Sequence, residues 1–127
     1  MRRSIPFLRA VAHHKILVVE DDHLIREAIA EALDEEGFEV LEAANGREAL
    51  DKLHAERASL VLLDLMMPIM DGWSFREAQL HDPEISNIPV VVLSALKDQS
   101  VPAERHFSKP CDLDELLDTV WEFTGGP

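Results

Sequence analysis

The fold of this chain is decided by the apolar run Leu60-Val61-Leu62-Leu63, which Asp64 follows directly. Two other runs have the same form: Ile16-Leu17-Val18-Val19 precedes Glu20 and Asp21, and Val90-Val91-Val92-Leu93 precedes Ser94. Uninterrupted aliphatic runs of this length favour strands of a parallel sheet that is buried on both faces. Ligands of such open sheets bind beyond the carboxyl ends of the strands. We therefore expect three carboxylates and a hydroxyl to meet at one rim, as in a divalent cation site with a reactive aspartate.

Length and composition indicate one globular domain. The chain has 127 residues, of which 46% are hydrophobic and 29% charged, enough for a core without disulfides. Its net charge of −13 argues against direct binding of nucleic acid or of anionic membranes, since both need a basic patch. No segment approaches the roughly 20 apolar residues of a membrane span. A single cysteine, Cys111, predicts a reducing, cytoplasmic setting.

Strands and helices alternate along the chain. Strands are predicted at residues 15–19, 38–43, 59–63, 89–93 and 106–108, and helices at 23–36, after Asn45, at 72–80 and after Asp112. Glu39 and Glu42 flank the apolar centre of the second strand, which predicts a strand at the sheet edge. The alternation favours parallel βαβ units, with helices on both faces of the sheet.

The first residues form a basic, partly apolar segment. Arg9 interrupts its apolar part, so it resembles a secretory signal only superficially. We predict a flexible or loosely docked extension over residues 1–14, a domain over 15–124 and a tail over 125–127.

The adjacent acids Glu20 and Asp21 repel each other unless a cation neutralises them. Mg²⁺ suits such a site, because it is a hard ion that few carboxylates and water can hold. Alternatively, these acids lie there because the dipole of the next helix favours them.

Three further residues could complete the site. Asp64 could bind the cation and act as a nucleophile that forms an acyl phosphate, although an aspartate there could also cap a turn. Ser94 could donate to a phosphoryl oxygen, or be an ordinary turn residue. Lys109 could offset the acids, and the bond to Pro110 after it belongs to the type that can be cis in tight turns.

Four segments in order resemble the receiver domain of two-component response regulators. They are residues 16–22, 63–72, 92–95 and 109–116, and the similarity covers about residues 15–123. The resemblance implies a flavodoxin-like, doubly wound α/β fold with a five-stranded parallel sheet in the order 2-1-3-4-5.

The resemblance also implies roles for the site residues. Asp64 would accept a phosphoryl group from a histidine kinase or a phosphotransfer protein. Mg²⁺ would be held by Asp21, Asp64 and the backbone carbonyl of Met66, with Glu20 acting through water. Ser94 and Lys109 would contact the phosphoryl group, whereas Asp22 would not be a ligand. The domain would be a signalling switch that acts through contacts with a downstream protein, and not an enzyme beyond its own phosphoryl uptake and loss.

The chain departs from the family pattern between Ser94 and Lys109. This segment is about two helical turns shorter than usual and contains Pro102, so the fourth helix is predicted to be short, distorted or absent. His106 stands three residues before the lysine, where Tyr or Phe is typical. It could simply be a surface histidine, with Phe107 as the buried ring. Cys111 is predicted to be an apolar filler and not a redox thiol.

Two alternatives stay open at this point. One is a receiver-like scaffold that is not phosphorylated. The other is an aspartate-nucleophile phosphatase of the dehalogenase type, which would need an Asp-x-Asp pair at the first strand, whereas Met66 stands two residues after Asp64. Met66 and Leu96 are apolar and cannot orient a water molecule, so we expect slow self-dephosphorylation.

Overall fold

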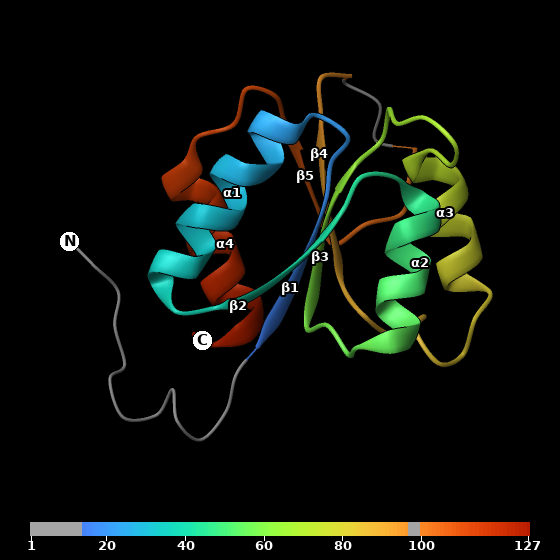
Figure 1. Cartoon of the computed structure of the whole chain (residues 1–127), viewed down its shortest axis with the longest axis horizontal. Coiled ribbons are helices and arrows are strands. Elements are labelled where there is room, and N and C mark those ends of the chain that lie inside the picture. The colour runs from blue at the N-terminus through green and yellow to red at the C-terminus, as the bar shows by residue number, and fades with distance from the viewer. Residues whose placement is uncertain (1–13, 97–99) are drawn as a thin grey trace.

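A five-stranded parallel sheet lies between two layers of helices (Figure 1). The computed structural model describes residues 14–96 and 100–127. The strands are β1 (Lys15–Val19), β2 (Glu39–Ala43), β3 (Leu60–Asp64), β4 (Val90–Ser94) and β5 (Arg105–Ser108), and the helices are α1 (His23–Glu36), α2 (Gly46–Ala55), α3 (Gly72–Leu80) and α4 (Leu113–Thr124). The strand order β2-β1-β3-β4-β5 confirms the predicted doubly wound fold.

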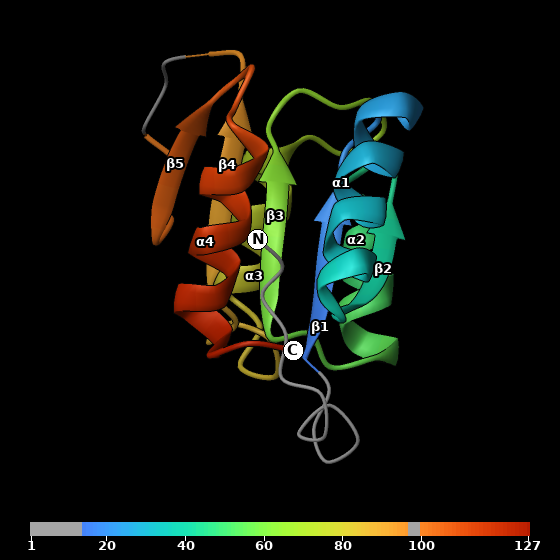
Figure 2. The same cartoon turned by 90° about the vertical axis from the view of Figure 1, so that its left-hand side faces the viewer.

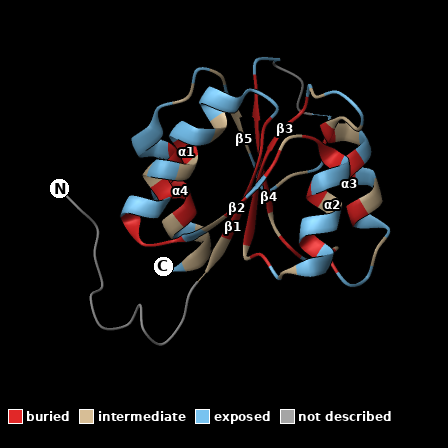
Figure 3. Ribbon diagram, in the orientation of Figure 1, coloured by how far each residue is buried: buried red, intermediate tan, exposed pale blue. Residues whose placement is uncertain are grey.

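The two faces of the sheet are covered by different helix pairs. Figure 2 shows α1 and α4 on the face turned to the viewer, with α2 and α3 behind the sheet. Alternate side chains of each central strand enter separate cores: Leu63 packs on the α2–α3 side, and Leu62 on the α1–α4 side. All residues of β3 and β4 are buried, as the red strands of Figure 3 show. This burial on both faces explains the uninterrupted aliphatic runs.

The two edge strands, β2 and β5, are more polar than the central strands. Glu39 and Glu42 of β2 are exposed, and β2 lies at an edge as predicted. The opposite edge is β5, whose first and last residues are exposed. Several strand limits differ by one residue from the prediction. For example, β4 begins at Val90 because Pro89 has no N–H for the ladder.

Side-chain caps start the helices where the sequence indicated. Asp22 accepts the N–H groups of Leu24 and Ile25 at the start of α1, and Asn45 and Asp112 cap α2 and α4. Gly37 ends α1 in the left-handed conformation, with φ of 104°. The capping role of Asp22 also accounts for its place directly after the acidic pair.

The connection between β4 and β5 contains no helix within residues 95–96 and 100–104, the part of it that the structure describes. The predicted loss or shortening of the fourth helix is confirmed there. Val101 alone of residues 100–104 is buried, and it enters the α2–α3 core.

The last helix is tied to α1 by a side-chain bond. Trp121 is half-buried, and its indole N–H donates to Glu36 at 3.1 Å. The predicted extension lies outside the described residues except for His14. None of the described helices is both long and apolar enough for a membrane span.

Candidate functional site

Three carboxylates meet at the carboxyl end of the sheet. Glu20 and Asp21 follow β1, and Asp64 ends the neighbouring strand β3, where Val19 is in register with Leu63. Each of the three acids offers an oxygen within 4.8 Å of the other two. Glu20 and Asp64 are buried, whereas Asp21 is exposed. The structure therefore brings together the acids that the sequence placed at two separate strand ends.

Lys109 provides the positive charge of this rim. Its Nζ donates to Glu20 Oε1 and lies 3.5 Å from Asp64 Oδ1. Its backbone N–H donates to the carbonyl of Ser94 at 2.8 Å, and the bond to Pro110 is cis. Burial opposes the charge on Lys109, but the hydrogen bond to Glu20 and the attraction of Asp64 outweigh it and raise the pKa of the ammonium group.

Ser94 closes the site at the end of β4. It is buried, and its hydroxyl oxygen accepts the N–H of Leu96 at 3.1 Å. A hydroxyl that accepts in this way keeps its own O–H as a donor. Leu93, the residue before it, is in register with Asp64, so Ser94 lies next to the end of β3.

The backbone beyond β3 fits closely around Asp64. Oδ1 of Asp64 accepts the N–H of Leu65 at 2.9 Å, and the N–H of Gly72 donates to the carbonyl of Leu65 at 2.8 Å. A Cβ on Gly72 would lie 2.5 Å from the carbonyl oxygen of Asp64. Only glycine therefore allows α3 to begin this close to the site.

The loop between β3 and α3 exposes apolar side chains. Met66 is 59% exposed, and Ile69 is 84% exposed with a φ of 70°. A β-branched residue is strained in this conformation, at a cost of about 1–3 kcal/mol. Met66 lies beside the acidic cluster, because it lines the same hollow as Asp21.

The donor set fits a hard divalent cation. Although Asp21 is exposed, the surrounding atoms remove part of its hydration, which raises the pKa of its carboxyl, and the nearby Glu20 raises it further. A cation bound among the carboxylates would relieve this repulsion, and oxygen ligands are those that Mg²⁺ prefers.

The residues around β5 have mixed environments. His106 is half-buried, and its Nε2–H donates to the carbonyl of Val101 at 2.9 Å, so it is not a free surface histidine. Phe107, also half-buried, packs against the core between the sheet and the α1–α4 layer. Burial raises the pKa of the Cys111 thiol, which lowers its reactivity and agrees with its prediction as a filler.

One contributor to the site was not predicted. Arg26 of α1 donates through Nη1 to the carbonyl of Glu20 at 2.8 Å and through Nε to Glu42 at 3.1 Å. It thereby ties the end of β1 to α1 and β2. Nothing in the spacing of the sequence indicates this contact, which depends on how α1 lies on the sheet.

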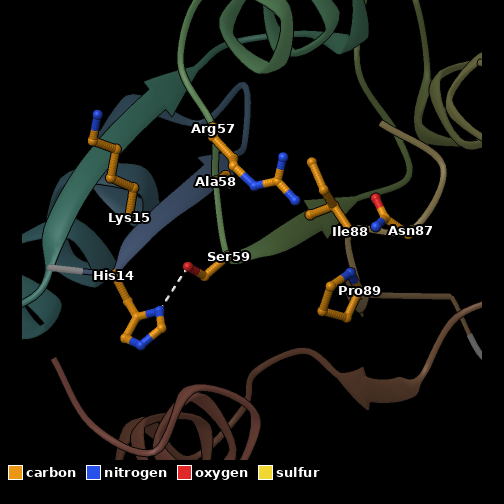
Figure 4. A pocket seen from close by; sticks show the side chains of 8 residues that line it. All are labelled: His14, Lys15, Arg57, Ala58, Ser59, Asn87, Ile88 and Pro89. Atoms are coloured by element: carbon orange, nitrogen blue, oxygen red, sulfur yellow. Dashed lines mark hydrogen bonds between the residues drawn. The ribbon is translucent and has the colours of Figure 1, made fainter. Parts of the chain in front are cut away.

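A hollow at the amino ends of β1, β3 and β4 does not form a comparable site. Figure 4 shows His14 bonded to Ser59, while Lys15 and Arg57 extend in different directions. Lys15 is already paired with Glu56 at 3.2 Å. The polar groups of this hollow do not converge on one point.

Comparisons with known proteins agree with this geometry. The family model for the response regulator receiver domain matches residues 16–121. The chain is 36% identical over 118 residues to sporulation initiation phosphotransferase F of Bacillus subtilis, covering 87% of this chain and 94% of that protein. It is 38% identical over 116 residues to the transcriptional regulatory protein CrdR of Helicobacter pylori, covering 86% of this chain but only 54% of that protein.

Solved structures show the same likeness. The signal receiver domain of a histidine kinase from Syntrophus aciditrophicus superimposes with a TM-score of 0.82 at 30% identity, covering 88% of this chain and 90% of that one. Chemotaxis response regulator CheY4 of Vibrio cholerae gives a TM-score of 0.80 at 29% identity, covering 88% and 99%. From its fold, its acidic rim and these relatives, the chain belongs to the family of response regulator receiver domains.

Proposed function

We propose that this receiver domain, a phosphorylatable signalling switch, accepts its phosphoryl group on Asp64. The observation that carries the proposal is the convergence of Glu20, Asp21 and Lys109 around this one buried aspartate. The name of the Bacillus subtilis relative, a phosphotransferase, supports transfer chemistry in the family.

The reaction balances as a direct displacement. A carboxylate oxygen of Asp64 forms a bond to phosphorus while the bond from phosphorus to the phosphohistidine nitrogen breaks. The imidazole of the donor keeps the electron pair and takes up a proton. Oδ1 already accepts the Leu65 N–H, so we assign Oδ2 as the attacking oxygen.

Asp21, Asp64 and the backbone carbonyl of Met66 would hold Mg²⁺, with Glu20 acting through water. The three carboxylates supply the hard oxygen ligands, and the spacing of their oxygens fits one ion. Bound there, the ion would neutralise charge on the incoming phosphoryl oxygens.

Lys109 and Ser94 would contact the transferred group. Lys109 now bonds to Glu20 and lies 3.5 Å from Asp64 Oδ1, so a phosphoryl group on Asp64 would give its ammonium group a further anionic partner. The free O–H of Ser94 would donate to a phosphoryl oxygen. Both residues would thus stabilise the phosphorylated state.

The partner that donates the phosphoryl group would dock on an apolar ring around the site. Seven large apolar side chains of the described residues are exposed, and all but Leu80 belong to segments that border the acidic rim: Leu24, Ile25, Met66, Ile69, Leu96 and Leu113. Isolated exposed residues need no explanation, but a ring around a reactive group indicates a contact surface. We infer that an apolar face of a histidine kinase or phosphotransfer protein covers this ring.

We infer that the output is also a protein contact and not catalysis on another substrate. The side chains that phosphoryl uptake requires are present at one rim, which supports the switch over a scaffold that takes no phosphate. The position of Asp64 on β3, with Met66 after it, does not fit the phosphatase alternative.

Incubation with acetyl phosphate and Mg²⁺ tests the proposal directly. We expect a hydroxylamine-labile mass gain of one phosphoryl group in the wild type and none in Asp64→Asn. Asp71→Asn is the matched control, because asparagine caps α3 as aspartate does and Asp71 lies outside the acidic cluster. Equal labelling of wild type and Asp64→Asn would refute Asp64 as the acceptor.

A further inference from the structure

Residues 100–104, here called the strap, take the place of a crossover helix between β4 and β5. Apolar packing holds the strap at two points only: Val101 is buried in the α2–α3 core, and Ala103 packs against that core. A helix in this place would bury several side chains against the sheet. Polar contacts add to this packing and hold the remaining residues of the strap.

Arg76 of α3 makes two of the described polar contacts of the strap, to Pro102 and to Glu104. Its Nε donates to the carbonyl of Pro102 at 2.7 Å, its Nη1 donates to Gln79 at 2.8 Å, and its Nη2 lies 3.6 Å from Glu104. Arg76 is only 5% exposed, which is unusual for an arginine. Gln79 is fully buried and donates to the carbonyls of Ile85 and Ile88, so the guanidinium group is itself held firmly.

The strap in turn holds β5. Glu104 pairs with Val90 through both its backbone N–H and its carboxylate, at 2.9 and 2.6 Å. The carbonyl of Val101 accepts the Nε2–H of His106, which lies in the middle of β5. Since β5 is short and partly exposed, these contacts add to its single ladder with β4.

β5 carries Lys109 to the site. His106 is in register with Val92, and three residues later the N–H of Lys109 bonds to Ser94 beside Asp64. A continuous series of described contacts therefore joins Arg76, on the side of α3, to the ammonium group at the rim.

We propose that Arg76 is a positioning residue for Lys109: by holding the strap it holds His106 and β5, and so fixes the ammonium group beside Asp64. The inference rests on the proposed function, because it assigns Lys109 to phosphoryl uptake. A misplacement of about 1 Å at a reacting group can lower a rate by up to about a hundredfold.

A double-mutant cycle with Lys109 tests this coupling. The rate of labelling by acetyl phosphate with Mg²⁺ would be measured for wild type, Arg76→Met, Lys109→Gln and the double variant. We expect Arg76→Met to lower the rate about tenfold in the wild-type background and less than twofold in the Lys109→Gln background, because the group it positions is then absent. Equal effects in both backgrounds would mean that Arg76 acts only through general stability and would overturn the proposal.

Two further variants keep the test decisive. Arg105→Met removes a different arginine of β5, one that pairs with Glu122 on the side of α4, and should leave the rate unchanged. His106→Ala removes the contact with Val101 and should also lower the rate of labelling. It provides a second test of the same series of contacts if Arg76→Met does not fold. A folded His106→Ala with the wild-type rate would overturn the proposal, whereas no labelling of the wild type would overturn the proposed function itself.

Discussion

Removing the charge of Asp21 should stabilise the metal-free protein. The side chain faces two other carboxylates, each with an oxygen within 4.8 Å. At this distance the repulsion of one pair is ~0.9 kcal/mol in water and ~3.5 kcal/mol at an effective dielectric constant of about 20. Because Asp21 is exposed and Lys109 offsets part of the repulsion, we take a net value of about 1 kcal/mol for Asp21→Asn.

The expected readout is a higher melting temperature in buffer that contains EDTA. A gain of about 1 kcal/mol corresponds to roughly 3–5 °C for a domain of this size. Mg²⁺ should raise the melting temperature of the wild type, since it binds the folded state only, and should have little effect on Asp21→Asn. Differential scanning calorimetry with and without Mg²⁺ measures both effects.

The pH dependence follows from the raised pKa of Asp21. A carboxyl with a raised pKa binds its proton more tightly in the folded protein than in the unfolded chain. Its carboxylate therefore lowers stability above that pKa, and the cost disappears as the pH falls through it. The difference in melting temperature between Asp21→Asn and the wild type should be largest near neutral pH and should shrink in acid.

Asp22→Asn is the matched control for this experiment. It removes one negative charge from the neighbouring residue but keeps the cap of α1, so we expect a change within about 0.5 kcal/mol. A lower melting temperature of Asp21→Asn than of the wild type without metal would refute the repulsion. An unchanged response to Mg²⁺ would remove Asp21 from the cation site.

Two other outcomes are expected. Gly72→Ala should lower stability by about 1–3 kcal/mol and slow the labelling of Asp64, because the new methyl group would lie 2.5 Å from a backbone oxygen. The control is Gly125→Ala, whose methyl group would meet nothing within 4 Å. It should lower stability by about 1–2 kcal/mol because of its φ of 80°, and it should leave the rate of labelling unchanged. The phosphorylated protein should lose its label over minutes or longer, since the apolar side chains of Met66 and Leu96 cannot orient water; decay within seconds in a mass-spectrometric time course would contradict this.

The local sequence was sufficient to predict where the strands lie and at which end of the sheet the functional site is found. Aliphatic runs report burial on both faces directly, because a strand that is covered by helices on both sides has no place for polar residues. Residues that follow such runs lie at the carboxyl ends of the strands, so the sequence predicted that Glu20, Asp64 and Ser94 share one rim. Caps such as Asp22 and Asn45 are equally local, since a helix start depends on a few adjacent residues.

The place of Lys109 depends on the tertiary structure. It bonds to a carboxylate 89 residues earlier in the chain, and from the residues alone its Lys-Pro pair said little. From the residues it could only be expected to offset the acids, and the resemblance to receiver domains added its contact with the phosphoryl group. The order of the strands decides which loops meet, and sequence spacing carries no information on that order unless a family pattern is recognised.

The structure of the strap and its contacts with β5 could not be predicted from the sequence. The short segment after Ser94 predicted that a helix was missing, but not what replaced it. Arg76 reads in the sequence as an ordinary charged helix residue, and its burial follows only from the packing of α3 beside the strap. In this protein, local patterns determined the strands and the acids at their ends, whereas long-range packing decided which positive charges stand beside those acids.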